Sequence, residues 1–207
     1  MQGKFIVFEG SDGSGKTTVI SKLIQKFKKE NIDIISLREP GGTAISEKIR
    51  EILLNVDNDK LSYKAECLLF AASRAQLVDE VIKPKLKENK LILCDRFILS
   101  SLLYQGIGRN LGINKVRDIN EFATGGLKPD LTIFLDIDAK TSLKRKRANF
   151  VSDRLEMEED SFHWAIYEGY KKLANLYKDQ ICTIDATREL DMVVDDCYKK
   201  IKEYIGD

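Results

Sequence analysis

A glycine-rich run near the N-terminus combines residue types that bind phosphate. Residues 10–17 read GSDGSGKT and match the pattern GxxxxGK[ST] at every fixed position. In this pattern the glycines let the backbone wrap around phosphate oxygens with its N–H groups pointing inward. Lys16 can reach the β- and γ-phosphates of a nucleotide, and Thr17 can ligate Mg²⁺. The expected ATP contacts of this loop are Gly10, Ser11, Asp12, Gly13, Ser14, Gly15, Lys16 and Thr17.

A second candidate group is the pair Asp95 and Arg96, which directly follows an apolar run at residues 91–94. If that run is a strand of an open parallel sheet, its carboxyl end faces the ligand crevice. We then expect Asp95 to hold Mg²⁺ through bound water and Arg96 to clamp a phosphate with two hydrogen bonds. A purely structural ion pair at a strand end is the alternative interpretation.

A third group of charges lies in residues 144–159, which read KRKRANFVSDRLEMEE. The segment carries Arg145, Arg147 and Arg154 among few apolar residues. A short mobile lid with these arginines could exclude water and neutralise charge on a phosphoryl group in transfer. The alternative is a solvated helix end followed by a loop.

Five nearly continuous apolar runs alternate with segments of helical period and would position these groups. Continuous apolar runs are typical of strands buried on both faces, as in parallel sheets. Strands that alternate with helices predict a single α/β domain over residues 1–207, with helices on both faces of the sheet. The expected strands are residues 5–8, 32–37, 91–94, 131–135 and 181–184, and the expected helices are residues 18–30, 45–53, 65–87, 160–178 and 189–204.

The composition excludes several other classes of protein. The chain has 207 residues, and its 34 Lys and Arg nearly balance 33 Asp and Glu. A net charge of +1 argues against a chain built to coat nucleic acid or an anionic membrane. No run approaches the roughly 20 apolar residues of a membrane helix, so we expect a cytoplasmic protein. The four cysteines form no CxxC pair, which favours buried reduced thiols over a metal site.

Other residues narrow the class of nucleotide chemistry. Residues 114–117 read NKVR, with Arg117 where a guanine-reading NKxD motif requires an acid, so we exclude a GTPase of that type. A nucleoside monophosphate is a ready nucleophile because its second phosphate pKa is about 6, and it requires no strong general base. This chemistry agrees with a chain whose one histidine, His163, lies in a predicted helix away from every motif.

Several short motifs, taken together, resemble those of the thymidylate kinases of bacterial type. They are EGSDGSGKTT, REPGGT, FAASR, CDRF followed by SSLLYQG, LDI and IDAT, and they extend in family order from Phe5 to about Thr187. The resemblance implies a P-loop three-layer sandwich with a five-stranded parallel sheet. It also implies transfer of the γ-phosphoryl group of ATP to dTMP with Mg²⁺ as cofactor. A homodimer formed through the helix at residues 65–87 is a further implication.

The resemblance also implies roles for individual residues. Asp12 would lie near the 3′-hydroxyl and phosphate of the acceptor, and Arg96 would bridge the acceptor and donor phosphates. Phe70 would stack on thymine, Arg74 would hydrogen-bond the base edge, and Tyr104 would crowd the sugar 2′-position. Further contacts implied are Ser101 and Gln105 to the base, Arg50 to the acceptor phosphate, and Asp185 and Ala186 beside adenine.

Some members of that family carry an arginine inside the phosphate loop, where this chain has Gly13. The resemblance is therefore to the subtype whose catalytic arginine comes from the lid. Arg154 is the first candidate, with Arg145 and Arg147 behind it. Two alternatives stay open: a kinase for a deoxynucleoside or another monophosphate, and a nucleotide-gated binding module without transfer activity.

Overall fold

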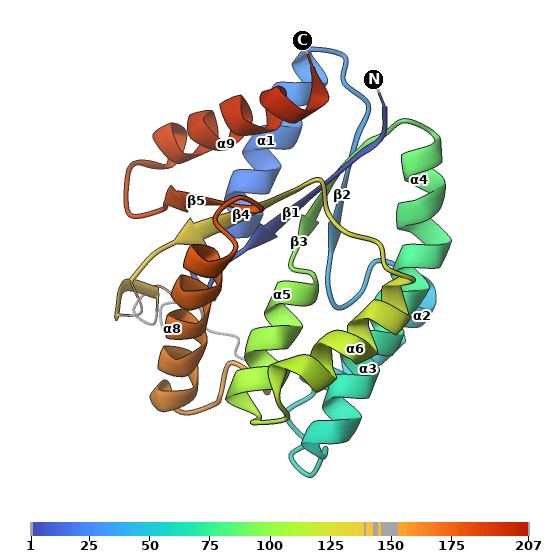
Figure 1. Ribbon diagram of the computed structural model, residues 1–207, viewed down its shortest axis with the longest axis vertical. Coiled ribbons are helices and arrows are strands. Elements are labelled where there is room, and N and C mark those ends of the chain that lie inside the picture. The colour runs from blue at the N-terminus through green and yellow to red at the C-terminus, as the bar shows by residue number, and fades with distance from the viewer. Residues whose placement is uncertain (1, 139, 143–144, 146–152, 207) are drawn as a thin grey trace.

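The computed structural model describes residues 2–138, 140–142, 145 and 153–206. Its centre is a sheet of five parallel strands in the order β2-β3-β1-β4-β5 (Figure 1). The sequence prediction of a parallel sheet is confirmed, although β2 begins two residues later than expected. The strands are β1 (Lys4–Glu9), β2 (Ile34–Arg38), β3 (Leu91–Asp95), β4 (Leu131–Asp136) and β5 (Ile181–Asp185).

The central strand β1 explains why the apolar runs are continuous. Alternate side chains of a strand point to opposite faces of the sheet. Ile6 and Phe8 pack on one face with α1 (Lys16–Lys29) and α9 (Leu190–Ile205). Phe5 and Val7 pack on the other face with residues of the long helix that precedes β3. Both faces are therefore buried, and the molecule has three layers, as expected from the sequence.

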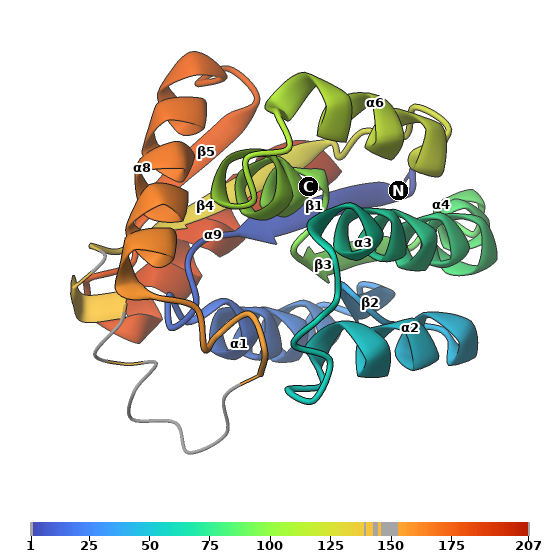
Figure 2. The same cartoon turned by 90° about the horizontal axis from the view of Figure 1, so that it is seen from below.

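The face opposite α1 and α9 also carries α8 (Asp160–Leu176). The aromatic ring of Tyr170 on α8 stacks on Phe134 of β4 with ring centroids 5.1 Å apart. Figure 2 shows α8 and α1 on opposite sides of the strands. The stacking fixes α8 beside the carboxyl ends of β1 and β4, where the glycine-rich loop begins.

Helices α2 (Ala44–Leu54) and α3 (Tyr63–Leu77) begin at clear capping residues. The Thr43 hydroxyl accepts a hydrogen bond from the Ser46 N–H at 3.0 Å, and Ser62 accepts one from Ala65 at 3.3 Å. From α3 the chain continues through a π-helical segment (Val78–Ile82) into α4 (Lys83–Lys87). The helix expected over residues 65–87 is therefore one helical stretch that contains a π-helical turn.

One helical region was not predicted. After β3 the chain forms α5 (Ile98–Ser101), a π-helical segment (Leu102–Gly108) and α6 (Ile113–Thr124). Ser101 and Gln105 are nearly fully buried here, because this stretch carries polar side chains toward the interior of the protein. The apolar periodicity that reveals a surface helix is therefore absent from residues 98–108. Irregular π-helical turns occur frequently at functional sites.

Candidate active site

A cleft of about 830 Å³ lies at the carboxyl ends of the strands. The central strand β1 has β3 on one side and β4 on the other, so the connections diverge here, and ligands of open α/β sheets bind at such points. The predicted site residues that line the cleft are Asp12, Gly13, Ser14, Gly15, Lys16, Thr17, Arg50, Phe70, Arg74, Asp95, Arg96, Ser101, Tyr104, Gln105, Arg145 and Ala186.

The glycine-rich loop connects β1 to α1 and folds over its own lysine. Gly13 and Gly15 have φ angles of 80° and 90°, which favour glycine because it has no Cβ. The ammonium group of Lys16 donates hydrogen bonds to the carbonyls of Gly10 and Ser11 at 3.0 and 3.1 Å. Burial lowers the pKa of Lys16, and the neighbouring charge of Arg96 lowers it further. Gly10 and Ser11 shape this loop without lining the cleft.

Thr17 and Asp95 form a pair of oxygen ligands at the start of α1 and the end of β3. The Thr17 hydroxyl donates a hydrogen bond to Asp95 Oδ2 at 3.1 Å. The other carboxylate oxygen, Oδ1, is buried and has no hydrogen-bond partner among the described residues. Mg²⁺ prefers oxygen ligands and often keeps several waters. The hydroxyl and the unsatisfied carboxylate therefore fit a hydrated magnesium ion.

Arg96 lies between the loop and the helix that follows β3. The backbone of Arg96 has a φ angle of 72°, which is uncommon for a residue other than glycine. Such backbone conformations tend to occur at functional sites. Its guanidinium contacts the Asp12 carboxylate in an ion pair and donates to the Ser100 hydroxyl at 3.1 Å. Asp12 also accepts a hydrogen bond from the Tyr104 hydroxyl at 3.1 Å. The structure thus brings together Asp12, Arg96 and Tyr104, which are far apart in the sequence.

Glu9, the last residue of β1, organises this region and was not singled out from the sequence. Its carboxylate accepts hydrogen bonds from the Phe97 N–H at 2.9 Å and from the hydroxyls of Ser100 and Tyr170 at 2.6 and 2.9 Å. Glu9 is fully buried, and each of these donors lies next to Arg96 in the chain or in space. An acid at the buried end of a strand, directly before the glycine-rich loop, was the signal that could have identified it.

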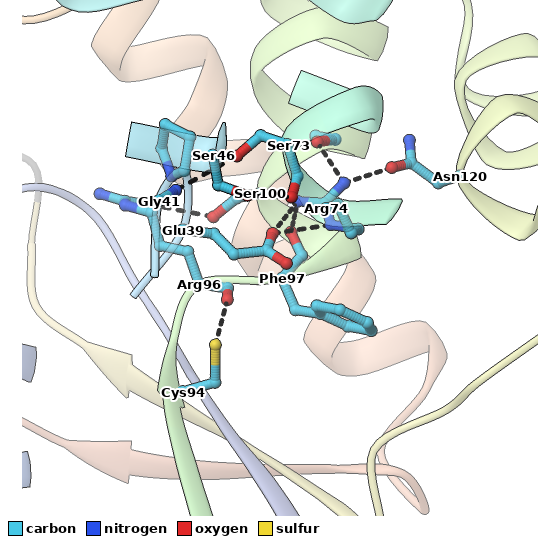
Figure 3. A network of polar contacts seen from close by, with 12 residues as sticks. Glu39, Gly41, Ser46, Ser73, Arg74, Cys94, Arg96, Phe97, Ser100 and Asn120 are labelled. Atoms are coloured by element: carbon cyan, nitrogen blue, oxygen red, sulfur yellow. Dashed lines mark hydrogen bonds and ion pairs between the residues drawn. The ribbon is translucent and has the colours of Figure 1, made fainter. Parts of the chain in front are cut away.

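Arg74 on α3 is the centre of a buried polar network (Figure 3). Its Nε donates to Glu39 at 2.7 Å, its Nη1 to Ser101 at 2.9 Å, and its Nη2 to the Phe97 carbonyl at 2.9 Å. Asn120 on α6 accepts a further hydrogen bond from Nη1. Burial raises the pKa of Glu39 to about 7 against the opposing effect of Arg74. The network holds Arg74 in one orientation at the floor of the cleft.

Two further arginines line the cleft beside the segment REPGGT. Arg50 on α2 donates a hydrogen bond to the Pro40 carbonyl at 2.8 Å. Arg38, at the end of β2, donates to the same carbonyl at 3.1 Å and forms an ion pair with Glu47. Arg38 was not among the residues predicted from the sequence, although it lies at the end of a strand, as Arg96 lies directly after one. Together they add positive charge at the α2 side of the cleft.

The three lid arginines differ in their placement. Arg145 lines the cleft, whereas Arg147 lies outside the described residues. Arg154 does not line the cleft: its guanidinium donates to the Leu53 carbonyl at 3.0 Å and to Glu66 at 2.6 Å. The structure therefore does not bring the first candidate for the catalytic arginine to the phosphate loop. Asp185 also lies outside the cleft lining, where its carboxylate accepts hydrogen bonds from Thr187.

Comparisons with known proteins agree with this geometry. The family model described as thymidylate kinase matches residues 8–197. A thymidylate kinase of Finegoldia magna is 52% identical over 198 residues, covering 96% of this chain and 97% of the relative. The chain belongs to the thymidylate kinase family. A relative from Lactobacillus delbrueckii subsp. bulgaricus is 48% identical over 98% of this chain and 97% of its own length.

Membership of the thymidylate kinase family confirms the resemblance found in the sequence motifs. The chain is accordingly a phosphotransferase of the nucleoside monophosphate kinase class, which decides against a binding module without transfer activity. Among the described residues, no helix is long and apolar enough to span a membrane.

Proposed function

We propose that this cleft transfers the γ-phosphoryl group of ATP to dTMP, which yields dTDP and ADP. The observation that carries the proposal is the continuity of one cleft from the phosphate loop to the pocket around Phe70, Arg74 and Gln105. A donor held at Lys16 and an acceptor base held at Phe70 would place both phosphates near Arg96. Direct transfer requires such proximity of the two phosphates.

In the proposed mechanism the protein supplies positioning and positive charge. The acceptor phosphate is already largely dianionic at neutral pH, so no residue has to remove a proton from it. Lys16 would bind the donor phosphates, and Arg96 would exchange its ion pair with Asp12 for contacts to phosphate oxygens. Arg145 and Arg50 would add charge from two sides of the cleft. These fixed cations would stabilise the negative charge that spreads over the transferring oxygens.

The residues of the acceptor pocket are suited to bind a pyrimidine deoxynucleotide. Phe70 would stack on the base, and the Tyr104 ring would crowd the sugar 2′-position. The Ser101 oxygen already accepts a hydrogen bond from Arg74, so its own hydrogen can be donated to a carbonyl oxygen of the base. Together with Arg74 and Gln105, this hydroxyl would read the base edge. Ala186 would border adenine at the opposite end of the cleft, with Asp185 supporting the turn that carries it.

Mg²⁺ would be held by Thr17 and, through water, by Asp95. When bound, the ion supplies positive charge that neutralises the β- and γ-phosphates of ATP. Thr17 and Asp95 would orient it at the mouth of the phosphate loop. The unsatisfied Asp95 Oδ1 is the observation that supports this assignment.

We also propose that the protein is cytoplasmic and forms a homodimer through α3. Leu68 on α3 is 56% exposed and Phe122 on the neighbouring α6 is 91% exposed, so both would gain from burial against a second copy. Light scattering after gel filtration would test this, since Leu68→Lys should give a monomer.

The four free cysteines agree with a reducing compartment. We assign the lid to residues 144–159 within a single domain.

A coupled assay that follows ADP release tests the acceptor directly. With ATP and Mg²⁺, we expect dTMP to give a higher kcat/KM than CMP, AMP or unphosphorylated thymidine. A preference for CMP or AMP would contradict the assignment of the pocket. A preference for thymidine would favour the alternative of a deoxynucleoside kinase.

A further inference from the structure

A buried cluster of charges lies beside the cleft, between α3 and the segment at residues 153–158. We call it the Glu66 cluster; its members are Glu66, Gln105, Arg109, Arg154 and Glu158. Glu66, near the start of α3, is 0% exposed. Its carboxylate accepts hydrogen bonds from Gln105 at 2.9 Å, from two nitrogens of Arg109 at 3.2 Å each and from Arg154 at 2.6 Å. The Glu66 carboxylate therefore connects α3 to residues 105–109 and to Arg154.

Arg154 is held in the Glu66 cluster by its backbone as well as its side chain. Its N–H donates to the Leu54 carbonyl at 3.1 Å, and its Nε donates to the Leu53 carbonyl at 3.0 Å. The side chain is only 9% exposed. These contacts attach residues 153–158 to the carboxyl end of α2 and to α3. Leu155 and Glu156, which follow directly, form part of the cleft wall.

Arg109 closes the cluster from the other side. It forms an ion pair with Glu158 at 2.6 Å, and its guanidinium lies over the rings of Tyr63 and Phe162 at 4.6 and 4.8 Å. The cluster thus contains two guanidinium groups and two carboxylates, and its charges balance. Removing one partner of a buried ion pair leaves the other charge uncompensated, which is strongly destabilising. Moving Arg154 into the cleft would carry this cost.

Gln105 connects the cluster to the acceptor pocket. It is 1% exposed, and it lines the cleft while its amide nitrogen donates to Glu66. Glu66 therefore fixes the orientation of Gln105 and the position of residues 153–158 at the same time. Hydrogen bonding to Arg109, Gln105 and Arg154 keeps the pKa of Glu66 low despite its burial.

We propose that Glu66 is a positioning residue that anchors residues 153–158 through Arg154 and orients Gln105 toward the acceptor base. Arg154 is then an anchor of the cleft wall, and among the described arginines of residues 144–159 it is Arg145 that lines the cleft. The inference rests on the proposed function, because it takes Gln105 to contact the base of dTMP. It differs from the sequence-based expectation that Arg154 acts on the transferring phosphoryl group.

Steady-state kinetics of Glu66→Gln, Arg154→Gln and the double variant test the proposal. Each single variant should raise KM for dTMP about tenfold and change kcat much less, because the acceptor pocket loosens while the phosphate loop stays intact. The double variant should be no worse than the poorer single variant, because both changes break the same interaction. Arg145→Ala should show the opposite pattern, with a loss of kcat and little change in KM for dTMP.

Two results would overturn the proposal. One is a kcat for Arg154→Gln at least a hundredfold lower with KM for dTMP unchanged, while Glu66→Gln keeps full activity, because Arg154 would then act on the phosphates. The other is an additive double variant. Glu88→Gln, which removes an exposed ion pair with Lys85, is the matched control and should behave as the wild type.

Thermal unfolding of each variant identifies any that fails to fold. Arg154→Lys then carries the test, because an ammonium group keeps the charge but cannot bond Glu66 and the Leu53 carbonyl in the same planar geometry. It should raise KM for dTMP, and an unchanged KM would refute the anchoring role. A wild-type enzyme that does not phosphorylate dTMP would instead contradict the proposed function, independently of these variants.

Discussion

The buried pair of Glu39 and Arg74 leads to a prediction with an unusual sign. Glu39 lies at the floor of the cleft, where burial raises its pKa from 4.5 to about 7. A carboxyl group with a raised pKa binds protons more tightly in the folded state than in the unfolded state. Its contribution to stability is therefore fully present below pH 4.5 and is lost as the pH rises through about 7. Glu39→Gln, which cannot ionise, should remove this pH dependence.

The magnitude follows from the two pKa values. Each unit of pKa difference corresponds to about 1.4 kcal/mol, so the full shift corresponds to about 3 kcal/mol. Between pH 5 and pH 8 the linkage relation gives a change of about 2–3 kcal/mol. The free energy of unfolding of Glu39→Gln, relative to the wild type, should therefore increase by about this amount over that range. Placing an amide beside Arg74 also changes the free energy of unfolding, but by the same amount at each pH. It therefore does not affect the change between pH 5 and pH 8.

Urea unfolding at pH 5, 6, 7 and 8, followed by circular dichroism, measures this change. Glu47→Gln is a suitable control because a backbone hydrogen bond from Gly42 lowers the pKa of Glu47. The wild-type contribution of Glu47 is present above the ordinary carboxyl pKa of 4.5 and is lost only as the pH falls below it, so the stability of Glu47→Gln relative to the wild type should stay nearly constant between pH 5 and pH 8. A relative stability of Glu39→Gln that stays constant from pH 5 to pH 8 would refute the reasoning, because the attraction of Arg74 would then balance burial.

Three further predictions concern the cleft and its support. Lys16→Ala should lower kcat at least about a hundredfold in the coupled assay, since it removes a preorganised cation, and a smaller loss would contradict its role at the phosphates. Tyr104→Ala should increase the relative kcat/KM for the ribonucleotide counterpart of dTMP about tenfold, and unchanged discrimination would show that the ring does not guard the 2′-position. Tyr170→Phe removes a hydrogen bond to buried Glu9 and should lower the free energy of unfolding by about 1–3 kcal/mol; a stability equal to the wild type would mean that Glu9 does not depend on it.

The sequence predicted the strands and the phosphate loop because both depend on local patterns. A strand buried on both faces needs a continuous apolar run, and Phe5 to Phe8 are all at most 1% exposed. The loop needs glycine at positions such as Gly13 and Gly15, whose positive φ angles other residues rarely adopt. Asp95 and Arg96 were also recognisable, because a strand end in a parallel sheet faces the crevice.

The remaining parts of the site depend on contacts between distant segments. Arg154 and Glu66 are 88 positions apart, so no local pattern reveals that the arginine is held outside the cleft. The charged segment at residues 144–159 indicated a cation near phosphate, yet it could not separate Arg145 from Arg154. Helix α5 and the π-helical segment after it were missed because Ser101 and Gln105 point polar groups inward, which removes the apolar stripe of a surface helix.

The central claim is direct transfer of phosphate between two nucleotides in one cleft. Phosphorus NMR of a mixture of enzyme, ATP, Mg²⁺ and dTMP follows this transfer without coupling enzymes. We predict that the γ-phosphate signal of ATP decreases in step with the appearance of the β-phosphate signal of dTDP. Accumulation of inorganic phosphate without dTDP, or no turnover of dTMP, would contradict the account.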